Sequence, residues 1–408
     1  MTQPQRYALV CRDCGQVRAP GVTRYACDTC GGELVVRYLA ATTQHARGPG
    51  IWRFADRLPG DAGRRQVSLG EGDTPLVPVG DDLRAMLGGA AMSVKCEHMN
   101  PTGSFKDRIA AVAVTLSAQR SIGGLVGTSS GNGGAAAAAY AARAGLPFTV
   151  FALADTVEQK LLQIRSMGAR VVLVRGVGHD AHATEAAAQA IAGEAARRRL
   201  FPFLTGGRFS PEAMEGAKTI AYELAEQASD ATHVYAPVGG GGLLAAVGRG
   251  YRELLAAGDI AAMPRIIGVQ PAGCPTMSPA LAGDFSGLHA PSTTTVSGLQ
   301  VAVLFDGRGA VEAIRLSEGH LTEVPDPEVW EAQRLLAHHE GILVEPAGAT
   351  ALAGALADAR EGRLGADARA VVLATGAGYK DSAALRRLSP STEVVAIDAD
   401  EIGGVLDG

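Results

Sequence analysis

Short runs of β-branched residues alternate with alanine-rich stretches from about residue 66 onward, and this alternation limits the folds open to the chain. Strands are predicted at 93–96, 124–127, 148–151, 171–174, 232–236, 266–269 and 371–374, and helices at 132–144 and 211–227. The first of these helices ends at Gly145, a residue typical of a helix C-terminus. Strands that are separated by helices pair in parallel. We therefore expect an α/β fold of open, twisted, mostly parallel sheets with helices on both faces.

The composition excludes several classes of protein. Of the 408 residues, 47% are hydrophobic and 19% are charged, which excludes a disordered chain. At about 150 residues per domain, the length predicts two to three domains. The 37 Lys and Arg against 42 Asp and Glu provide no basic surface for nucleic acid or an anionic membrane. Because the sequence has neither a long apolar run nor a signal-peptide core, we expect a soluble cytoplasmic protein without nucleic-acid or membrane partners.

Four of the six cysteines lie in the first 30 residues, in two C-x-x-C knuckles that are each followed by glycine. Four soft ligands at this spacing fit a closed tetrahedral zinc site. A metal-free remnant with reduced thiols is one alternative. A redox pair is another, disfavoured because such motifs normally precede a helix in a βαβ unit. The sequence predicts a zinc-ribbon-like module at 1–40, with structural zinc held by Cys11, Cys14, Cys27 and Cys30.

Three glycine-rich turns follow predicted strands, at 127–134, 237–242 and 374–378. The first turn places hydroxyls and backbone N–H groups at a helix N-terminus, where a carboxylate or phosphate binds. The second turn contains four consecutive glycines, so its backbone can close around an anion without a side chain in the way. One alternative for this second turn is a dinucleotide fingerprint, but the next predicted strand lacks the acidic residue that holds a ribose. The other is a turn needed only for helix–sheet packing.

Lys106 follows a Pro-Thr-Gly turn and a phenylalanine, and it leads into an apolar helix at 109–116. A lysine is most often a solvated surface charge. A lysine held against apolar surface instead has a lowered pKa and can form a Schiff base. One phosphate cradle, one carboxylate cradle and one such lysine together point to pyridoxal phosphate as the cofactor.

The segment 100–108 resembles the lysine motif of the threonine synthase family, within the fold type II (tryptophan-synthase-β-like) pyridoxal enzymes. Four further segments look like the family's later motifs, in the same order: 128–133, 239–242, 344–349 and 375–381. The ribbon-like start and the segment 71–76 also occur in many threonine synthases. The resemblance covers about residues 7–385. It implies a large cofactor-binding domain (41–115 and 210–408) and a small domain (116–209) that closes over the active site.

The resemblance also implies roles for individual residues at the cofactor. Lys106 would form the Schiff base and later move protons at Cα and Cβ of the substrate. Phe105 would pack on the cofactor face, and Asn132 would hydrogen-bond its 3-hydroxyl. Thr375 would face the pyridine nitrogen, where a hydroxyl leaves the ring less electron-poor than a carboxylate would and so suits elimination and replacement. The phosphate would be held by the backbone N–H groups of Gly239, Gly240, Gly241 and Gly242.

Substrate recognition departs from the family pattern at one segment. Threonine synthases typically carry an arginine, within the stretch that corresponds to 210–219, that helps to hold the phosphate of O-phosphohomoserine. Ala213 stands at that position here, and Glu212 beside it would repel a dianion. The substrate carboxylate is expected at the hydroxyl side chains Thr128, Ser129 and Ser130, with helix capping as the alternative for the two serines.

The function that the resemblance favours is threonine synthesis from O-phosphohomoserine, by a lyase that acts on a small amino acid and is usually a homodimer. A displaced phosphate site could use Lys160, Arg165 and Arg208, although helix surfaces commonly carry such charges. Two alternatives stay open: a β-replacement synthase similar to cysteate synthase, and a threonine or serine dehydratase that forms a 2-oxo acid. A degenerate regulatory protein is a different class, which the intact lysine and glycines disfavour.

Overall fold

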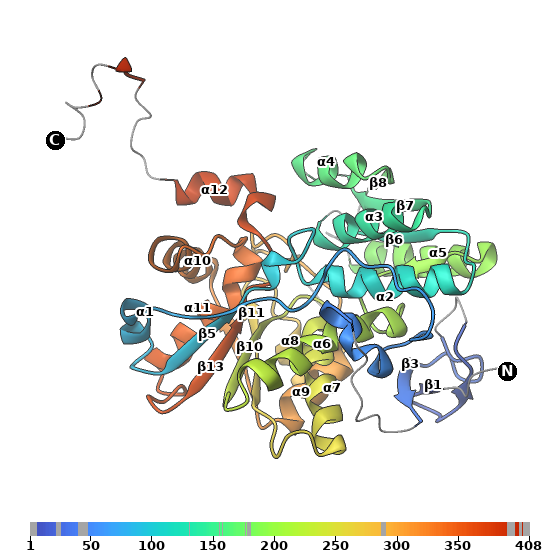
Figure 1. Cartoon of the computed structure of the whole chain (residues 1–408), viewed down its shortest axis with the longest axis horizontal. Helices are drawn as coiled ribbons and strands as arrows, with labels where there is room; N and C mark the ends of the chain where they lie inside the picture. The colour runs from blue at the N-terminus through green and yellow to red at the C-terminus, as the bar shows by residue number, and fades with distance from the viewer. Residues whose placement is uncertain are drawn as a thin grey trace.

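The computed structural model describes residues 6–21, 26–39, 48–129, 131–154, 156, 158–175, 177, 181–286, 291–389, 396–399 and 402, without the side chains of 159, 160 and 181. Three sheets organise this part of the chain, and helices surround the two larger ones (Figure 1). The α/β class with parallel-rich sheets is confirmed. Each of the seven predicted strands overlaps an observed strand to within one residue at its ends or lies inside it, and the helices predicted at 132–144 and 211–227 have those bounds.

The largest sheet has six strands in the order β12-β11-β10-β13-β5-β4. Five of them run parallel, and the edge strand β4 runs antiparallel to β5. The strands are β4 (Leu76–Pro78), β5 (Ala91–Lys95), β10 (His233–Pro237), β11 (Arg265–Pro271), β12 (Leu321–Val324) and β13 (Arg369–Leu373).

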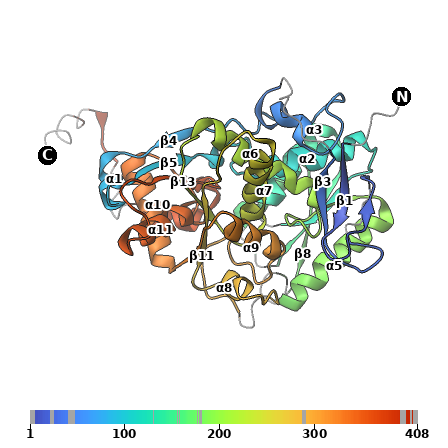
Figure 2. The same cartoon turned by 90° about the horizontal axis from the view of Figure 1, so that it is seen from below.

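Helices cover both faces of this sheet, as Figure 2 shows. On β10, Tyr235 packs into one hydrophobic core with helix α11, while its neighbours Val234 and Ala236 pack into the other core with α7 and α9. Alternate side chains of a strand point to opposite faces, so this central strand is buried from both sides. The helices and 3₁₀ turns of this region are η1 (Gly50–Arg57), α1 (Asp81–Met86), η2 (Glu97–Met99), α6 (Pro211–Gln227), α7 (Gly242–Ala257), α8 (Met277–Leu281), α9 (Gly307–Leu316), α10 (Asp326–Glu340), α11 (Pro346–Arg360), η3 (Gly378–Lys380) and α12 (Ser382–Leu388).

The second sheet has four parallel strands in the order β8-β7-β6-β9. The four-stranded sheet with its helices is called the small unit below, and the six-stranded sheet with its helices is called the large unit. Helix α2 packs against α3 of the small unit and against α6 of the large unit, so it joins the two units. The elements are α2 (Lys106–Gln119), β6 (Leu125–Thr128), α3 (Asn132–Ala144), β7 (Phe148–Leu153), α4 (Glu158–Ser166), β8 (Arg170–Val174), α5 (Ala181–Arg198) and β9 (Phe201–Phe203).

The third sheet is small and antiparallel, and it lies at the N-terminal end of the chain. Its strands are β1 (Tyr7–Cys11), β2 (Val17–Arg18) and β3 (Leu34–Tyr38). The hydroxyls of Tyr7 and Tyr38 donate to Glu212 and Glu215 on α6, which docks the sheet on the large unit. The predicted domain bounds stay a prediction.

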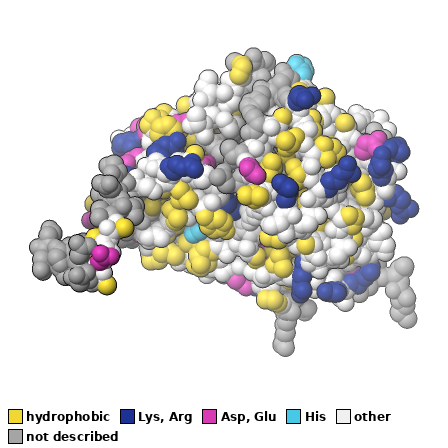
Figure 3. Space-filling view, turned by 90° about the horizontal axis from the view of Figure 1, so that it is seen from above, with side chains coloured by type: hydrophobic (Ala, Val, Ile, Leu, Met, Phe, Trp, Pro, Cys, Tyr) yellow, Lys and Arg dark blue, Asp and Glu magenta, His cyan; other side chains and the backbone are white. Residues whose placement is uncertain are grey.

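On the face shown in Figure 3, Lys and Arg side chains are scattered between apolar and neutral ones. Among the described residues, no helix combines the length and the apolar character needed to cross a membrane.

Candidate active site

A cavity of about 590 Å³ lies where the two parallel sheets meet. Its walls include the turns that follow β6, β10 and β13, and the C-terminal ends of parallel strands are the usual place for a ligand in such folds. The described residues that the sequence assigned to cofactor and substrate all line it, namely Phe105, Lys106, Thr128, Ser129, Asn132, Gly239, Gly240, Gly241, Gly242 and Thr375. Ser130 lies outside the described residues.

Lys106 is the first residue of α2, and its Nζ lies 4.5 Å from the centroid of the Phe105 ring. The loop before it is tied to the segment after β13: the N–H of Phe105 donates to the carbonyl of Thr375 (3.2 Å), and the N–H of Ala377 donates to that of Gly103 (2.9 Å). Burial lowers the pKa of Lys106 to about 8, although Asp306 acts in the opposite direction. The amine is therefore a competent nucleophile close to neutral pH.

The glycine run Gly239–Gly242 joins β10 to α7 and forms one wall of the cavity. Gly241 has a φ of +86°, in the left-handed region that other residues avoid. A Cβ on Gly242 would lie 2.7 Å from Cε of Met214 and 2.8 Å from Oδ2 of Asp306. An anion in this wall meets backbone N–H groups at a helix N-terminus, which fits a phosphate.

We expect Gly242→Val to weaken pyridoxal phosphate binding about 10- to 100-fold. The added side chain overpacks the loop, at a cost of about 1–3 kcal/mol, and displaces the N–H groups of the loop. The measurement is a titration of the apoprotein with cofactor, followed by the Schiff-base absorbance. Gly193→Ala on α5 is the control, because a Cβ there meets nothing within 4 Å. An unchanged affinity of the Gly242 variant would contradict the assignment of this wall to the phosphate.

Glu345 also lines the cavity, although the sequence analysis gave it no role beyond its place in a motif. Nδ2 of Asn132 donates to Oε1 of Glu345 (2.6 Å), which joins α3 to the start of α11. A Cβ on Gly376 would overlap this Oε1, so glycine is required beside Thr375. The sequence signal that could have identified Glu345 is its position directly before Pro346, the first residue of α11.

The hydroxyl side chains expected at the substrate carboxylate lie beside the start of α3. Thr128 and Ser129 line the cavity, and Oγ of Ser129 accepts from the N–H of Gly131 (3.3 Å). Gly131 is itself the N-cap of α3, and no side chain caps that helix. The described hydroxyls are thus placed to face a ligand at the helix N-terminus, as the carboxylate role requires.

The basic residues considered for the substrate phosphate lie away from the cavity or are not described. Arg165 is exposed on α4, and Arg208 pairs with Glu185 (2.9 Å); neither lines the cavity. The side chain of Lys160 lies outside the described residues.

The departure at 210–219 has a different consequence from the one expected. Ala213 is fully buried within α6, and the carboxylate of Glu212 pairs with Arg120 (2.6 Å). Because neither residue lines the cavity, the expectation that Glu212 would repel a bound dianion is wrong. Its charge is already neutralised by the arginine.

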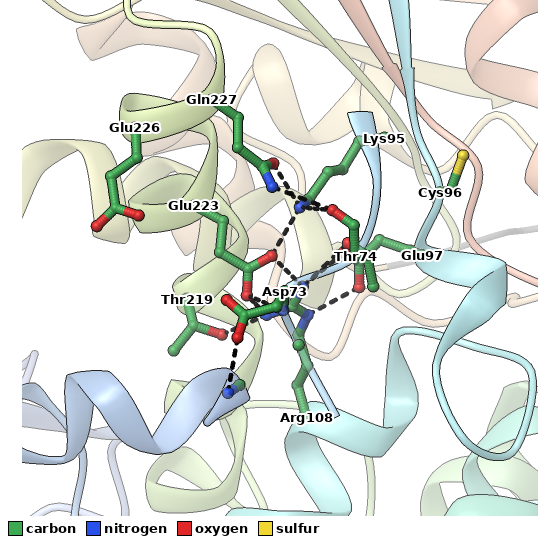
Figure 4. Close-up of polar contacts among 12 residues, drawn as sticks. Asp73, Thr74, Lys95, Cys96, Glu97, Arg108, Thr219, Glu223, Glu226 and Gln227 are labelled. Carbon is green, nitrogen blue, oxygen red and sulfur yellow. Dashed lines mark hydrogen bonds and ion pairs between the residues drawn. The ribbon is translucent and has the colours of Figure 1, made fainter. Parts of the chain in front are cut away.

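A buried charge cluster (Lys95, Glu97, Arg108 and Glu223) holds the start of α2 in place, as Figure 4 shows. The guanidinium of Arg108 pairs with Glu97 (2.7 Å) and Glu223 (2.6 Å), and Lys95 pairs with Glu223 (2.6 Å). All four side chains are fully buried. Although burial opposes ionisation, Arg108 and Lys95 hold the pKa of Glu223 at about 2. Since Arg108 follows Lys106 by two positions in α2, the cluster also fixes the backbone that carries Lys106.

The four N-terminal cysteines converge on one point, with their sulfur atoms within 4.8 Å of one another. Gly15 and Gly31 follow the knuckles with φ of +74° and +73°, the left-handed turn expected of them. A Cβ on Gly32 would collide with the side chain of Asp13. Four thiols in this arrangement fit the ligand set of one tetrahedral metal ion.

Comparisons with known proteins agree with this geometry. A family model described as pyridoxal-phosphate dependent enzyme matches residues 67–376. A threonine synthase of Methanocaldococcus jannaschii is 33% identical over 410 residues, which cover 97% of this chain and 98% of that protein. A threonine synthase of Mycobacterium leprae is 34% identical over 88% of this chain and 96% of that protein. The crystal structure of a T.th. threonine deaminase matches with a TM-score of 0.62 at 32% identity, over 76% of this chain and 93% of that one.

Proposed function

The chain belongs to the threonine synthase family of pyridoxal-phosphate-dependent enzymes, and on that premise we propose that it converts O-phosphohomoserine and water into threonine and inorganic phosphate. The observation that carries the proposal is the cavity in which Lys106 lies together with the glycine wall Gly239–Gly242. Nearly full-length similarity to proteins named threonine synthase supports this choice of reaction within the family.

The residues of the cavity divide the work between cofactor and substrate. Pyridoxal phosphate, when bound, withdraws electrons from the amino acid and so makes its Cα proton acidic. Lys106 would hold it, with the glycine wall at its phosphate and the side chains Phe105, Asn132 and Thr375 around its ring. The amine of Lys106 accepts and returns protons at Cα and Cβ of the substrate, a role that its lowered pKa favours. Thr128 and Ser129 bind the substrate carboxylate at the N-terminus of α3.

The assay that tests this proposal offers O-phosphohomoserine, threonine, serine and O-phosphoserine separately to the purified protein. Release of phosphate with formation of threonine from the first compound is expected. The second candidate is a dehydratase, favoured by the similarity to the T.th. threonine deaminase. Formation of 2-oxobutyrate from threonine, without threonine synthesis, would replace the proposal with that candidate.

We also propose that the four-cysteine cluster holds structural zinc. Arg12 and Asp13, within the first knuckle, pair with Glu312 (3.2 Å) and Arg308 (2.5 Å) on α9, so metal binding would order a surface that docks on the large unit. The compartment and subunit arrangement are proposed from the sequence and the family as cytoplasmic and homodimeric, and sedimentation of the purified protein tests the second point.

Removing the metal should lower the thermal unfolding midpoint by several degrees, because a structural zinc contributes directly to folding. Elemental analysis is expected to find one zinc ion per chain, lost on treatment with a strong chelator. Cys27→Ser should reproduce the destabilisation, whereas Cys274→Ser, at a buried cysteine outside the cluster, should leave the metal content unchanged. Protein that is purified without metal and is insensitive to the chelator would refute the zinc site.

A further inference from the structure

The cavity walls offer very few positive charges to a phosphorylated substrate. Among the described residues that line it, only two are cationic, Lys106 and Lys380. Lys106 is committed to the cofactor, and the glycine wall is committed to the cofactor phosphate. We propose that Lys380 binds the phosphate group of the substrate and thereby selects a phosphorylated amino acid, an inference that rests on the proposed function.

Lys380 is held at the cavity wall by contacts with both units. It ends η3, and its Nζ donates to Oε1 of Gln163 (2.9 Å) on α4. Nε2 of Gln163 donates in turn to the carbonyl of Thr102 (3.2 Å). A Cβ on Gly103 would lie 2.8 Å from Cε of Lys380, so the lysine side chain lies along the loop that carries Lys106. The ammonium of Lys380 therefore lies beside the loop that precedes Lys106 and faces α4 of the small unit.

Apart from the glycine wall, the cavity offers a second dianion few groups that bind it strongly. Glu345 is the one acidic residue among the described lining residues, and its Oε1 accepts from Asn132. Asp107 does not line the cavity, and burial raises its pKa to about 7, while hydrogen bonds from Thr102 and, to a smaller extent, the charge of Lys380 act to lower it. The remaining polar lining groups are neutral hydroxyls and amides, which bind a dianion more weakly than an ammonium does.

The loss of arginine at 213 is consistent with this assignment. Ala213 is buried in α6, away from the cavity, so a cation for the substrate phosphate has to come from another element. Lys380 comes from the segment 375–381, of which Thr375 also lines the cavity. A lysine there acts as a point charge toward phosphate, without the two-point geometry of arginine.

The competing explanation is that Lys380 has a purely structural role, because Lys380 and Gln163 together connect α4 to the loop that contains Thr102 and precedes Lys106. The variants K380M and Q163L separate the two roles: both break this connection, but only K380M removes the charge. K380R restores a cation and serves as the conservative rescue. The cofactor absorbance of each purified holoenzyme shows whether the site is still formed.

The probe is inorganic phosphate, measured by its perturbation of the cofactor absorbance and by its inhibition of turnover. We expect K380M to weaken phosphate binding about 10- to 100-fold, the usual effect of losing a charged hydrogen bond, and to raise KM for O-phosphohomoserine more than it lowers kcat. Q163L should change phosphate binding less than about threefold, and K380R should recover most of the loss.

Unchanged phosphate binding in K380M would overturn the inference, and so would an equal loss in Q163L. A wild-type holoenzyme that binds no phosphate would overturn it as well. If the wild type binds phosphate through Lys380 but does not turn over O-phosphohomoserine, the proposed function fails while the phosphate site stands.

Discussion

Lys106→Ala should lower kcat by about 10³- to 10⁴-fold or more and should abolish the Schiff-base absorbance band. The reason is that, in the proposed function, one amine serves both as the attachment point of the cofactor and as the group that moves protons. Burial lowers its pKa to about 8, so an appreciable share of the amine is neutral and nucleophilic near neutral pH. The measurements are an absorbance spectrum with added cofactor and a phosphate-release assay.

Lys106→Arg is the informative control, because it keeps the positive charge but cannot form the Schiff base. Arginine should therefore fail as completely as alanine. In the wild type, the rate at which the apoprotein takes up cofactor should rise as the pH rises through about 8, where the amine loses its proton, and should level off above. A variant without this lysine that keeps both the band and full activity would refute the assignment.

Arg108→Met should destabilise the protein by about 3–5 kcal/mol, because it removes the arginine that pairs with Glu97 and leaves Glu223 paired only with Lys95, while both carboxylates stay buried. Desolvated charges that lose their partner cost far more than a lost surface pair. The free energy of unfolding in urea measures the effect. Cofactor binding should weaken as well, since the first turn of α2 carries Lys106.

The matched control removes an arginine from an exposed pair. Arg334 lies 2.7 Å from Glu331 on α10, and both side chains are about half exposed, so Arg334→Ala should cost less than about 1 kcal/mol. Similar losses in the two variants would show that the buried charge cluster contributes no more than a surface pair.

Local chemistry made most of the site predictable. In the glycine run between β10 and α7, Gly241 has a backbone torsion that other residues avoid, and Gly242 has no room for a Cβ. The spacing of the four cysteines likewise predicted that their sulfur atoms converge, and they do. Short strands were harder: β9 contains Pro202, which weakens any strand signal, and its three residues pair only because β6 lies beside them.

The sequence by itself determined the class of fold and singled out Lys106 and the run Gly239–Gly242, both of which line the cavity. Each of these features depends on neighbouring residues whose backbone preferences are local. Tertiary structure alone decided which distant groups share the cavity. Glu345 meets Asn132 across 213 positions, and Lys380 meets Gln163 across 217. It also turned Glu212 away from the cavity toward Arg120. Contacts of this kind depend on how helices from two sheets pack together, which no single stretch of residues encodes.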